Sequence, residues 1–231
     1  MQGLAANTKK VLEIVKEYKL LSDYYLVGGT GISIQLGHRL SEDLDLFYYN
    51  KNAGGKSFEP PYRKEILKQF KKDFQIEFLN ETKNMSRFTA DSVKIDLYAE
   101  HQFHAPKNFN QIGNIKLPSL IELAGMKMIN LFFRQVYRDL YDLTALAQKL
   151  TNDDFYLGYT AVMSKFYLGA NKKNKNVKRN SYNNLVIKFL QNKEYVEEMV
   201  KDFDLEELEP KMNLTEDLIL ETFAGFGNIT N

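Results

Sequence analysis

The chain has 231 residues, of which 44% are hydrophobic and 26% are charged, and its formal net charge is +1. Because the chain is nearly neutral, no global electrostatic field favours nucleic acid or a membrane surface as a partner, and any basic surface must be local. The lack of Cys argues against a disulfide framework and a thiolate zinc site. The sequence shows no apolar leader and no run of about 18 apolar residues, so we expect a cytoplasmic protein that does not span a membrane.

The first predicted elements are a helix and a strand that lead into a glycine turn. Apolar residues recur at helical spacing over residues 9–21 and predict an amphipathic helix. The short apolar run Leu26-Val27 then stops at Gly28-Gly29, where the backbone can adopt conformations closed to residues with a Cβ. This order predicts a strand that ends in a tight turn.

A second helix and a strand follow the turn. From Thr30 onward, Ile32, Leu36 and Leu40 recur at i, i+4 and i+8, the spacing of a helix that buries one narrow face. The period then changes to two. In a strand over residues 43–46, both aspartates point to one face and both leucines to the other.

The glycine turn and the paired carboxylates together predict a site for a triphosphate. Backbone N–H groups at Gly29 and Thr30, at the start of a helix, favour an anion. Asp43 and Asp45 can share hard divalent cations, Mg²⁺ or Mn²⁺, which bridge phosphate oxygens in nucleotidyl transfer. Each half also has a simpler explanation, since a Gly-Gly pair is often only a turn and an acid-x-acid strand is often a half-exposed edge.

The same stretch resembles the first motif of the AbiEii/AbiGii toxin family of nucleotidyltransferases. In that family a Gly-Gly-Ser/Thr turn precedes a Gln-x-x-His-Arg-x-Ser-x-Asp-Leu-Asp-x-Phe run. The matching residues of this chain are Gly28, Gly29, Thr30, Gln35, His38, Arg39, Ser41, Asp43, Leu44, Asp45 and Phe47. Gly31 departs from the alanine common there, which weakens the local helix without removing a chemical group.

The middle of the chain predicts a helix over residues 60–72, opened by a Pro-Pro pair, and three strands. Alternating apolar residues predict one strand over residues 74–78. Residues 86–90 and 93–98 predict a hairpin joined by Asp91-Ser92.

Asp96 is a carboxylate in the otherwise largely apolar second strand of that hairpin, which costs free energy unless it is exposed, paired or bound to metal. A solvent-facing Asp is the plain alternative. Nucleotidyltransferases of this superfamily place a third carboxylate on a strand beside the first pair, so the resemblance implies that Asp96 completes a metal site with Asp43 and Asp45. His101 and His104 follow in a segment without a helical pattern, and we expect surface loop histidines there.

Ser119 and Glu122 have capping-box spacing and predict that a long helix starts at Leu120 and continues to Leu143. Its apolar residues cluster on one face, and the opposite face carries Lys127, Arg134, Arg138 and Asp142. Simple solvation is the ordinary explanation of such a stripe. The order of these residues resembles the second long motif of the same family, with its lysine, arginine and Lys/Arg-Asp-x-x-Asp-Leu ending. The resemblance implies that cations of this helix clamp phosphates as pyrophosphate leaves, and that Lys127 faces the carboxylates of the sheet domain.

The remaining chain is predicted to be helical and carries no recognisable chemistry. Helical patterns cover residues 155–168, 181–190, 193–203 and 214–223. Residues 171–180 form a basic loop between the first two, which could contact the phosphates of a polynucleotide acceptor, although a solvated lysine-rich loop is the default.

We therefore predict an α+β fold: a nucleotidyltransferase-type mixed sheet with flanking helices over residues 1–117, then a helical bundle over residues 118–231. The resemblance implies transfer of a nucleoside monophosphate from an NTP to an acceptor, with release of pyrophosphate, in a toxin-antitoxin or phage-defence setting with a cognate antitoxin. It implies catalytic roles for Asp43, Asp45, Asp96 and Lys127, with Mg²⁺ or Mn²⁺ on the three aspartates. It implies nucleotide binding by Gly28, Gly29, Thr30, Arg39, Lys127, Arg134, Arg138 and Asp142.

The acceptor we expect is RNA, such as a tRNA 3′ end. A protein or small-molecule acceptor stays open, as does a non-catalytic nucleotide- or RNA-binding module with the same fold.

Overall fold

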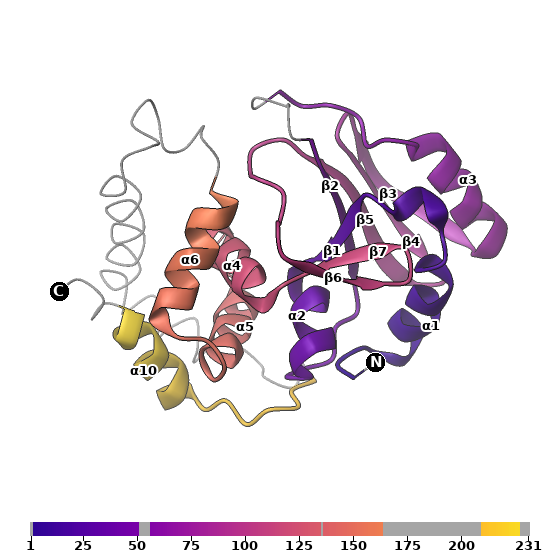
Figure 1. Cartoon of the computed structure of the whole chain (residues 1–231). Helices are drawn as coiled ribbons and strands as arrows, with labels where there is room; N and C mark the ends of the chain where they lie inside the picture. Colours follow the sequence, from indigo (N-terminus) through magenta and orange to yellow (C-terminus); the bar gives the residue numbers. More distant parts are fainter. Residues whose placement is uncertain (1, 51–55, 135, 164–208, 227–231) are drawn as a thin grey trace. The chain divides into compact units, whose positions relative to one another are not determined.

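A seven-stranded mixed sheet organises the first half of the chain, and its strand order is β3-β4-β5-β2-β1-β7-β6 (Figure 1). In that order the strands are β3 (Ile76–Thr82), β4 (Met85–Ala90), β5 (Val93–Glu100), β2 (Leu44–Tyr49), β1 (Tyr24–Val27), β7 (Ile115–Pro118) and β6 (Phe109–Ile112). The β2–β5 and β1–β7 pairs are parallel and the other pairs are antiparallel. The predicted mixed sheet with flanking helices is confirmed.

The computed structural model describes residues 2–50, 56–134, 136–163 and 209–226. The chain divides into two compact units, Met1–Ser119 and Leu120–Asn231, whereas the sequence placed the domain boundary after residue 117. Across the described ranges, none of the helices is long and apolar enough to cross a membrane.

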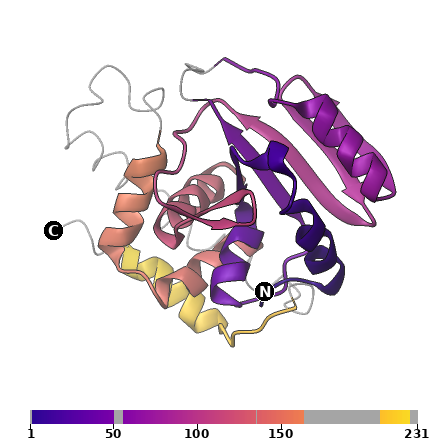
Figure 2. The same cartoon turned by 45° about the vertical axis from the view of Figure 1, so that its right-hand side comes forward.

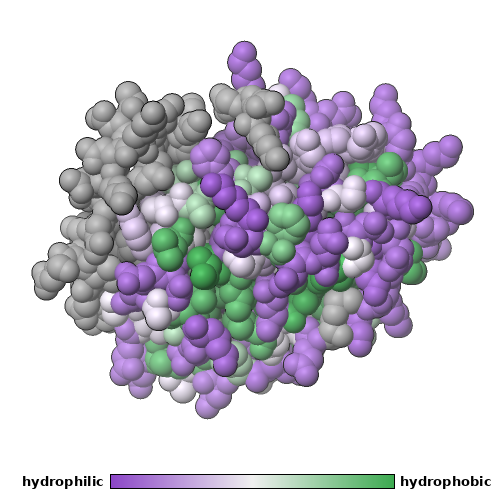
Figure 3. Space-filling model, in the orientation of Figure 1, coloured by the Kyte–Doolittle hydropathy of each residue, from purple (hydrophilic) through white to green (hydrophobic). Residues whose placement is uncertain are grey.

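One face of the sheet packs against α1 (Ala6–Val15), the 3-10 turn η1 (Lys19–Leu21) and α3 (Arg63–Asp73). Figures 1 and 2 both place α1 and α3 on the same side of the sheet. Leu44 and Leu46 of β2 are fully buried in this core, as is Leu97 of β5. Because side chains alternate along a strand, the intervening residues of β2 and β5 must point to the opposite face. The side of the molecule where α3 lies is mostly hydrophilic outside (Figure 3).

The helix after the glycine turn, α2 (Gly28–Leu36), is shorter than the repeat of apolar residues predicted. It ends because Gly37 adopts a left-handed conformation with φ 65°, which caps the helix. Leu40 therefore lies beyond the helix, and the prediction that it continues the helical face is wrong.

The sheet contains one confirmed hairpin and one unpredicted strand. Asp91 and Ser92 join β4 to β5 with φ values of 46° and 69°, the two positive values that a tight hairpin turn requires. The strand β6 was missed, because its residues 109–112 are mostly exposed and show no apolar alternation. It pairs along its length with β7.

The second unit is helical in its described part, with α4 (Leu120–Arg134), α5 (Tyr137–Ala147), α6 (Asn152–Val162) and α10 (Glu216–Phe226). The single helix predicted from Leu120 to Leu143 is wrong. Val136 has an extended backbone with φ −101° and ψ 134°, which ends the helical path between α4 and α5. The predicted helices over residues 181–190 and 193–203, and the basic loop over residues 171–180, lie outside the described residues.

Two glycines let α4 and α6 approach each other closely. A Cβ added to Gly125 would overlap the carbonyl group of Gly158, and one added to Gly158 would overlap the carbonyl oxygen of Ile121. The helix backbones are therefore in direct contact, and a side chain at either position has no space.

We expect Gly125→Ala to destabilise the protein by about 1–3 kcal/mol, because the added methyl group must push α4 and α6 apart. Gly225→Ala on α10 is the matched control, since no described atom beyond its neighbouring residues and its own helix backbone lies within 4 Å of the added Cβ. Alanine favours a helix over glycine, so the control should keep or raise stability by up to about 1 kcal/mol. Urea unfolding measures both, and equal stabilities would contradict the proposed close packing.

Candidate functional site

The carboxylates predicted from the sequence lie in one row across the sheet. Asp45 on β2 pairs in register with Asp96 on the parallel strand β5, and Asp96 pairs with Arg87 on β4. On its other side Asp45 pairs with Val27, the last residue of β1. Neighbouring strands lie about 4.8 Å apart, so these side chains stand beside one another on the face opposite the core. Asp43 precedes β2 by one residue and shares this face by alternation.

The glycine turn brings a helix end to the same row. Gly28 has φ 68°, and a Cβ at this position would collide with Oδ2 of Asp45. Only glycine fits both the backbone conformation and the neighbouring carboxylate. Gly28 also begins α2, whose N-cap residue Val27 makes no side-chain cap hydrogen bond. The first backbone N–H groups of this helix, including that of Gly29, thus start beside the carboxylate of Asp45.

The side chain of Thr30 holds the carboxylate segment in place. Its hydroxyl is 2.7 Å from Oγ of Ser41 and donates to the carbonyl oxygen of Asp43, and the residue is buried. Thr8 adds a second anchor, since its hydroxyl donates to the carbonyl of Glu42 at 2.9 Å. The hydroxyl of Thr30 is therefore committed to positioning Asp43.

Gln35, another motif residue, connects α2 to the sheet. Its Nε2 donates to the carbonyl oxygen of Pro118 at 3.1 Å, where β7 ends. This hydrogen bond fixes α2 against the parallel neighbour of β1.

Two cations pair with the carboxylates, and the sequence analysis missed both. Arg87 donates from Nε to Oδ1 of Asp96 and from Nη2 to Oδ2, each at 2.7 Å. Lys94 of β5 forms an ion pair with Asp43. The hydrogen bonds that Arg87 donates to Asp96 raise the pKa of Arg87, and the negative charges of Asp96, Asp45 and Asp43 add to this effect. The signal was available, because Lys94 shares a face with Asp96 in the predicted hairpin.

The three aspartates offer hard oxygen ligands of the kind that Mg²⁺ and Mn²⁺ prefer. Over the described part of the chain, no group of three or more His, Cys, Asp or Glu side chains is placed to hold a metal ion. Two of the three carboxylates are instead paired with cations, Asp43 with Lys94 and Asp96 with Arg87. The chemistry of the donor set fits a divalent cation, and a cation bound at Asp43 would take the place of Lys94.

Glu100 is the last residue of β5, and by alternation its side chain lies on the same face as that of Asp96. Its Oε1 accepts the backbone N–H groups of Gln102 at 2.6 Å and Phe103 at 3.2 Å. Burial raises the pKa of this carboxyl group above its ordinary value, against the lowering effect of these hydrogen bonds. Glu100 thus fixes the segment that leaves β5.

In the second unit, Lys127 lies in a closed cluster with two carboxylates. Its Nζ is 2.6 Å from Oδ1 of Asp139 and 2.6 Å from Oδ2 of Asp142, and all three side chains are at most 4% exposed. The sequence placed Lys127 and Asp142 on one face of a single helix. They lie instead on α4 and α5, which face each other. Asp139 was missed as a site residue, although it belongs to the recognised Arg-Asp-x-x-Asp motif.

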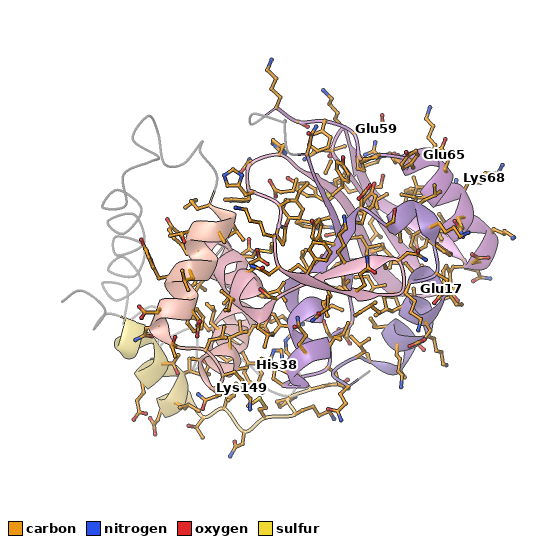
Figure 4. All side chains as sticks on the ribbon, in the orientation of Figure 1. Glu17, His38, Glu59, Glu65, Lys68 and Lys149 are labelled. Atoms are coloured by element: carbon orange, nitrogen blue, oxygen red, sulfur yellow. The ribbon has the colours of Figure 1, made fainter. Side chains whose placement is uncertain are left out.

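The remaining predicted cations are Arg39, Arg138 and Arg134, and the structure describes the side chains of the first two. Arg39 is 6% exposed, follows the C-terminal end of α2, and donates from Nη1 to the carbonyl of Leu40 at 3.2 Å. His38, labelled in Figure 4, is fully buried near the same end. Arg138 is half-buried on α5, and the side chain of Arg134 lies outside the described residues. The predicted approach of Lys127 to the first unit stays a prediction.

Comparison with known proteins identifies relatives along nearly the whole chain. The model of the family described as nucleotidyl transferase AbiEii toxin, type IV TA system, matches residues 12–224. An uncharacterised protein of Aquifex aeolicus (strain VF5), aq_aa25, is 29% identical over 153 residues, which cover 64% of this chain and 69% of that protein. The crystal structure of JHP933 from Helicobacter pylori has a TM-score of 0.52 and 18% identity, and the match covers 98% of this chain and 91% of that one. At this identity the likeness shows the fold alone.

We expect Lys127→Met to destabilise the protein by about 3–5 kcal/mol, because it leaves two buried carboxylates without their cation. Asp139→Asn should cost less, since Lys127 keeps Asp142. Lys16→Met is the control, because its ion pair with Glu13 lies at the surface, where an ion pair contributes little to stability. Denaturant unfolding ranks the variants, and a Lys127→Met protein as stable as the control would contradict the closed cluster.

The raised pKa of Glu100 predicts a pH-dependent difference in stability. A carboxyl group whose pKa is higher in the folded state contributes stability below its unfolded pKa, and this contribution is lost as pH rises through the folded pKa. Glu100→Gln keeps an acceptor oxygen for the two N–H groups but cannot ionise. The melting temperature of the variant relative to wild type should therefore rise with pH above about 4.5. The exposed Glu77→Gln should show no such trend.

Proposed function

We propose that this chain, which belongs to the AbiEii family of nucleotidyl transferase toxins of type IV toxin-antitoxin systems, transfers a nucleoside monophosphate from an NTP to an acceptor and releases pyrophosphate. The observation that carries the proposal is the row formed by Asp45 and Asp96, with Asp43 on the same face and the N-terminus of α2 beside it. Carboxylates can bind the metal of a metal-triphosphate complex, and a helix N-terminus can bind its phosphates.

In this proposal Asp43, Asp45 and Asp96 hold Mg²⁺ or Mn²⁺. The metal, when bound, stabilises charge on the attacking and leaving oxygens of an in-line displacement. Gly28 and Gly29 let phosphate oxygens approach the N–H groups of α2, where the helix dipole favours negative charge. Thr30 keeps Asp43 in place through its buried hydroxyl.

The charges of the row support binding of a metal-nucleotide complex rather than free nucleotide. The three carboxylates outnumber the two cations, Arg87 and Lys94, by one. The row is therefore repulsive to a triphosphate, and a single bound dication reverses its sign. Lys94, if it were released from Asp43, would be a cation available to the phosphates.

For pyrophosphate release we propose Arg134 and Arg138 of the second family motif, because the third cation of that motif, Lys127, is held by Asp139 and Asp142. Support for this role comes from the motif itself. The non-catalytic alternative is disfavoured, because all three carboxylates are present and two of them stand in register on adjacent strands.

The acceptor we propose is RNA with a free terminal hydroxyl, such as a tRNA 3′ end. The sequence supports this proposal through the basic residues Lys172, Lys173, Lys175, Lys178 and Arg179 in a nearly neutral chain. Clustered cations favour a polyanion and make its binding salt-dependent. Membership of a type IV toxin-antitoxin family implies a cognate antitoxin as the second partner.

The test is pyrophosphate release with each labelled NTP, magnesium or manganese, and total RNA or purified tRNA. We expect Asp45→Asn to lower turnover by roughly a hundred-fold or more while the fold survives, because an approximate isostere replaces one metal-binding charge. Asp23→Asn is the matched control, since its carboxylate is 71% exposed and lies outside the row. Wild-type turnover in Asp45→Asn would remove the assignment. Label that appears in protein or small molecules instead of RNA would overturn the acceptor.

A further inference from the structure

The strands that carry the carboxylates continue into a pair of aromatic rings. Phe47 on β2 pairs in register with Tyr98 on β5, two residues beyond the Asp45–Asp96 pair along both strands. Residues two apart on a strand share a face and lie about 6.6 Å apart. The two rings therefore stand on the face of the carboxylates, one row further along, with centroids 4.8 Å apart and planes tilted by 45°.

This aromatic pair is both supported and accessible. The ring of Phe47 also approaches Tyr49, at 6.4 Å between centroids, and Tyr49 packs edge-on against Tyr25. Tyr25 and Tyr49 are 7% exposed and form a buried base, whereas Phe47 and Tyr98 are only half-buried. The rings are thus fixed in place without being part of the core that packs under α1 and α3.

The order of the two rows matches the order of groups in a nucleotide. The first row, Asp45 and Asp96, is charged and lies beside the N-terminus of α2. The second row, Phe47 and Tyr98, has flat apolar rings and lies about one sugar width from the first row. Every nucleobase has a π-face, and stacking on aromatic side chains binds bases with little dependence on their identity. Binding of a protein, a peptide or a small acceptor would not by itself require aromatic rings beside the charged row.

We propose that Phe47 and Tyr98 form a stacking platform for the nucleobase of the incoming NTP, with its triphosphate on the carboxylate row. This inference rests on the proposed nucleotidyl transfer and adds the feature that selects a nucleotide over a bare polyphosphate. It implies that all four NTPs bind, with purines ahead of pyrimidines because their stacked area is larger.

The test compares two ligands that share phosphates but differ in the base. A non-hydrolysable ATP analogue and inorganic tripolyphosphate are titrated calorimetrically into the full chain with magnesium. Phe47→Leu keeps apolar bulk but removes the aromatic face, and it should weaken binding of the ATP analogue by roughly five- to a hundred-fold while leaving tripolyphosphate unchanged.

Phe78→Ala is the matched control. Phe78 is 42% exposed on β3 and packs against Phe88 of the opposite, core face, so its loss should change neither affinity. If wild type binds tripolyphosphate as tightly as the ATP analogue, or if Phe47→Leu weakens both equally, the platform is overturned while the proposed transfer stands. If wild type with magnesium binds neither ligand, the proposed function itself fails and the platform falls with it.

Discussion

The parallel pairing of β2 with β5 is the constraint on which the candidate site depends. Both strands bury alternate apolar residues, such as Leu46 and Leu97, against α1 and α3. The register Leu46↔Leu97 then also places Asp45 beside Asp96 on the other face. A slip by one residue would turn the carboxylates into the core and the leucines outward, which hydrophobic burial forbids. Core packing thus enforces the geometry of the site.

Carboxylates held this close together need cations beside them. The cations of the two units differ in how exposed they are. Arg87 and Lys94 are about two-fifths exposed, at 41% and 38%, so water can solvate the carboxylates in their place. Lys127 and its two carboxylates are at most 4% exposed, where an unpaired charge is strongly unfavourable. The first arrangement can exchange its partners. The second holds α4 to α5 and resists exchange.

On the sheet face opposite α1 and α3, the charged row is followed along β2 and β5 by the aromatic row. The N-terminus of α2 lies at the charged row because Gly28 alone fits beside Asp45. The next row offers the rings of Phe47 and Tyr98, and the buried Glu100 ends the strand beyond them. A nucleotide, which is anionic at one end and flat and apolar at the other, matches this direction. The same backbone register that aligns the carboxylates aligns the rings.

The sequence by itself determined the family motif, the hairpin turn at Asp91-Ser92 and the common face of Asp43 and Asp45, because periods of two and turn chemistry are local properties. The tertiary structure decided what those local patterns leave open. Arg87 and Lys94 reach carboxylates through strand order and register, over separations of nine residues for Arg87–Asp96 and 51 for Lys94–Asp43. The extended backbone at Val136 turned one predicted helix into two, and so converted a presumed solvent stripe into the closed Lys127 cluster. Such contacts depend on which elements pack together, and a pattern read along one element cannot specify its partner.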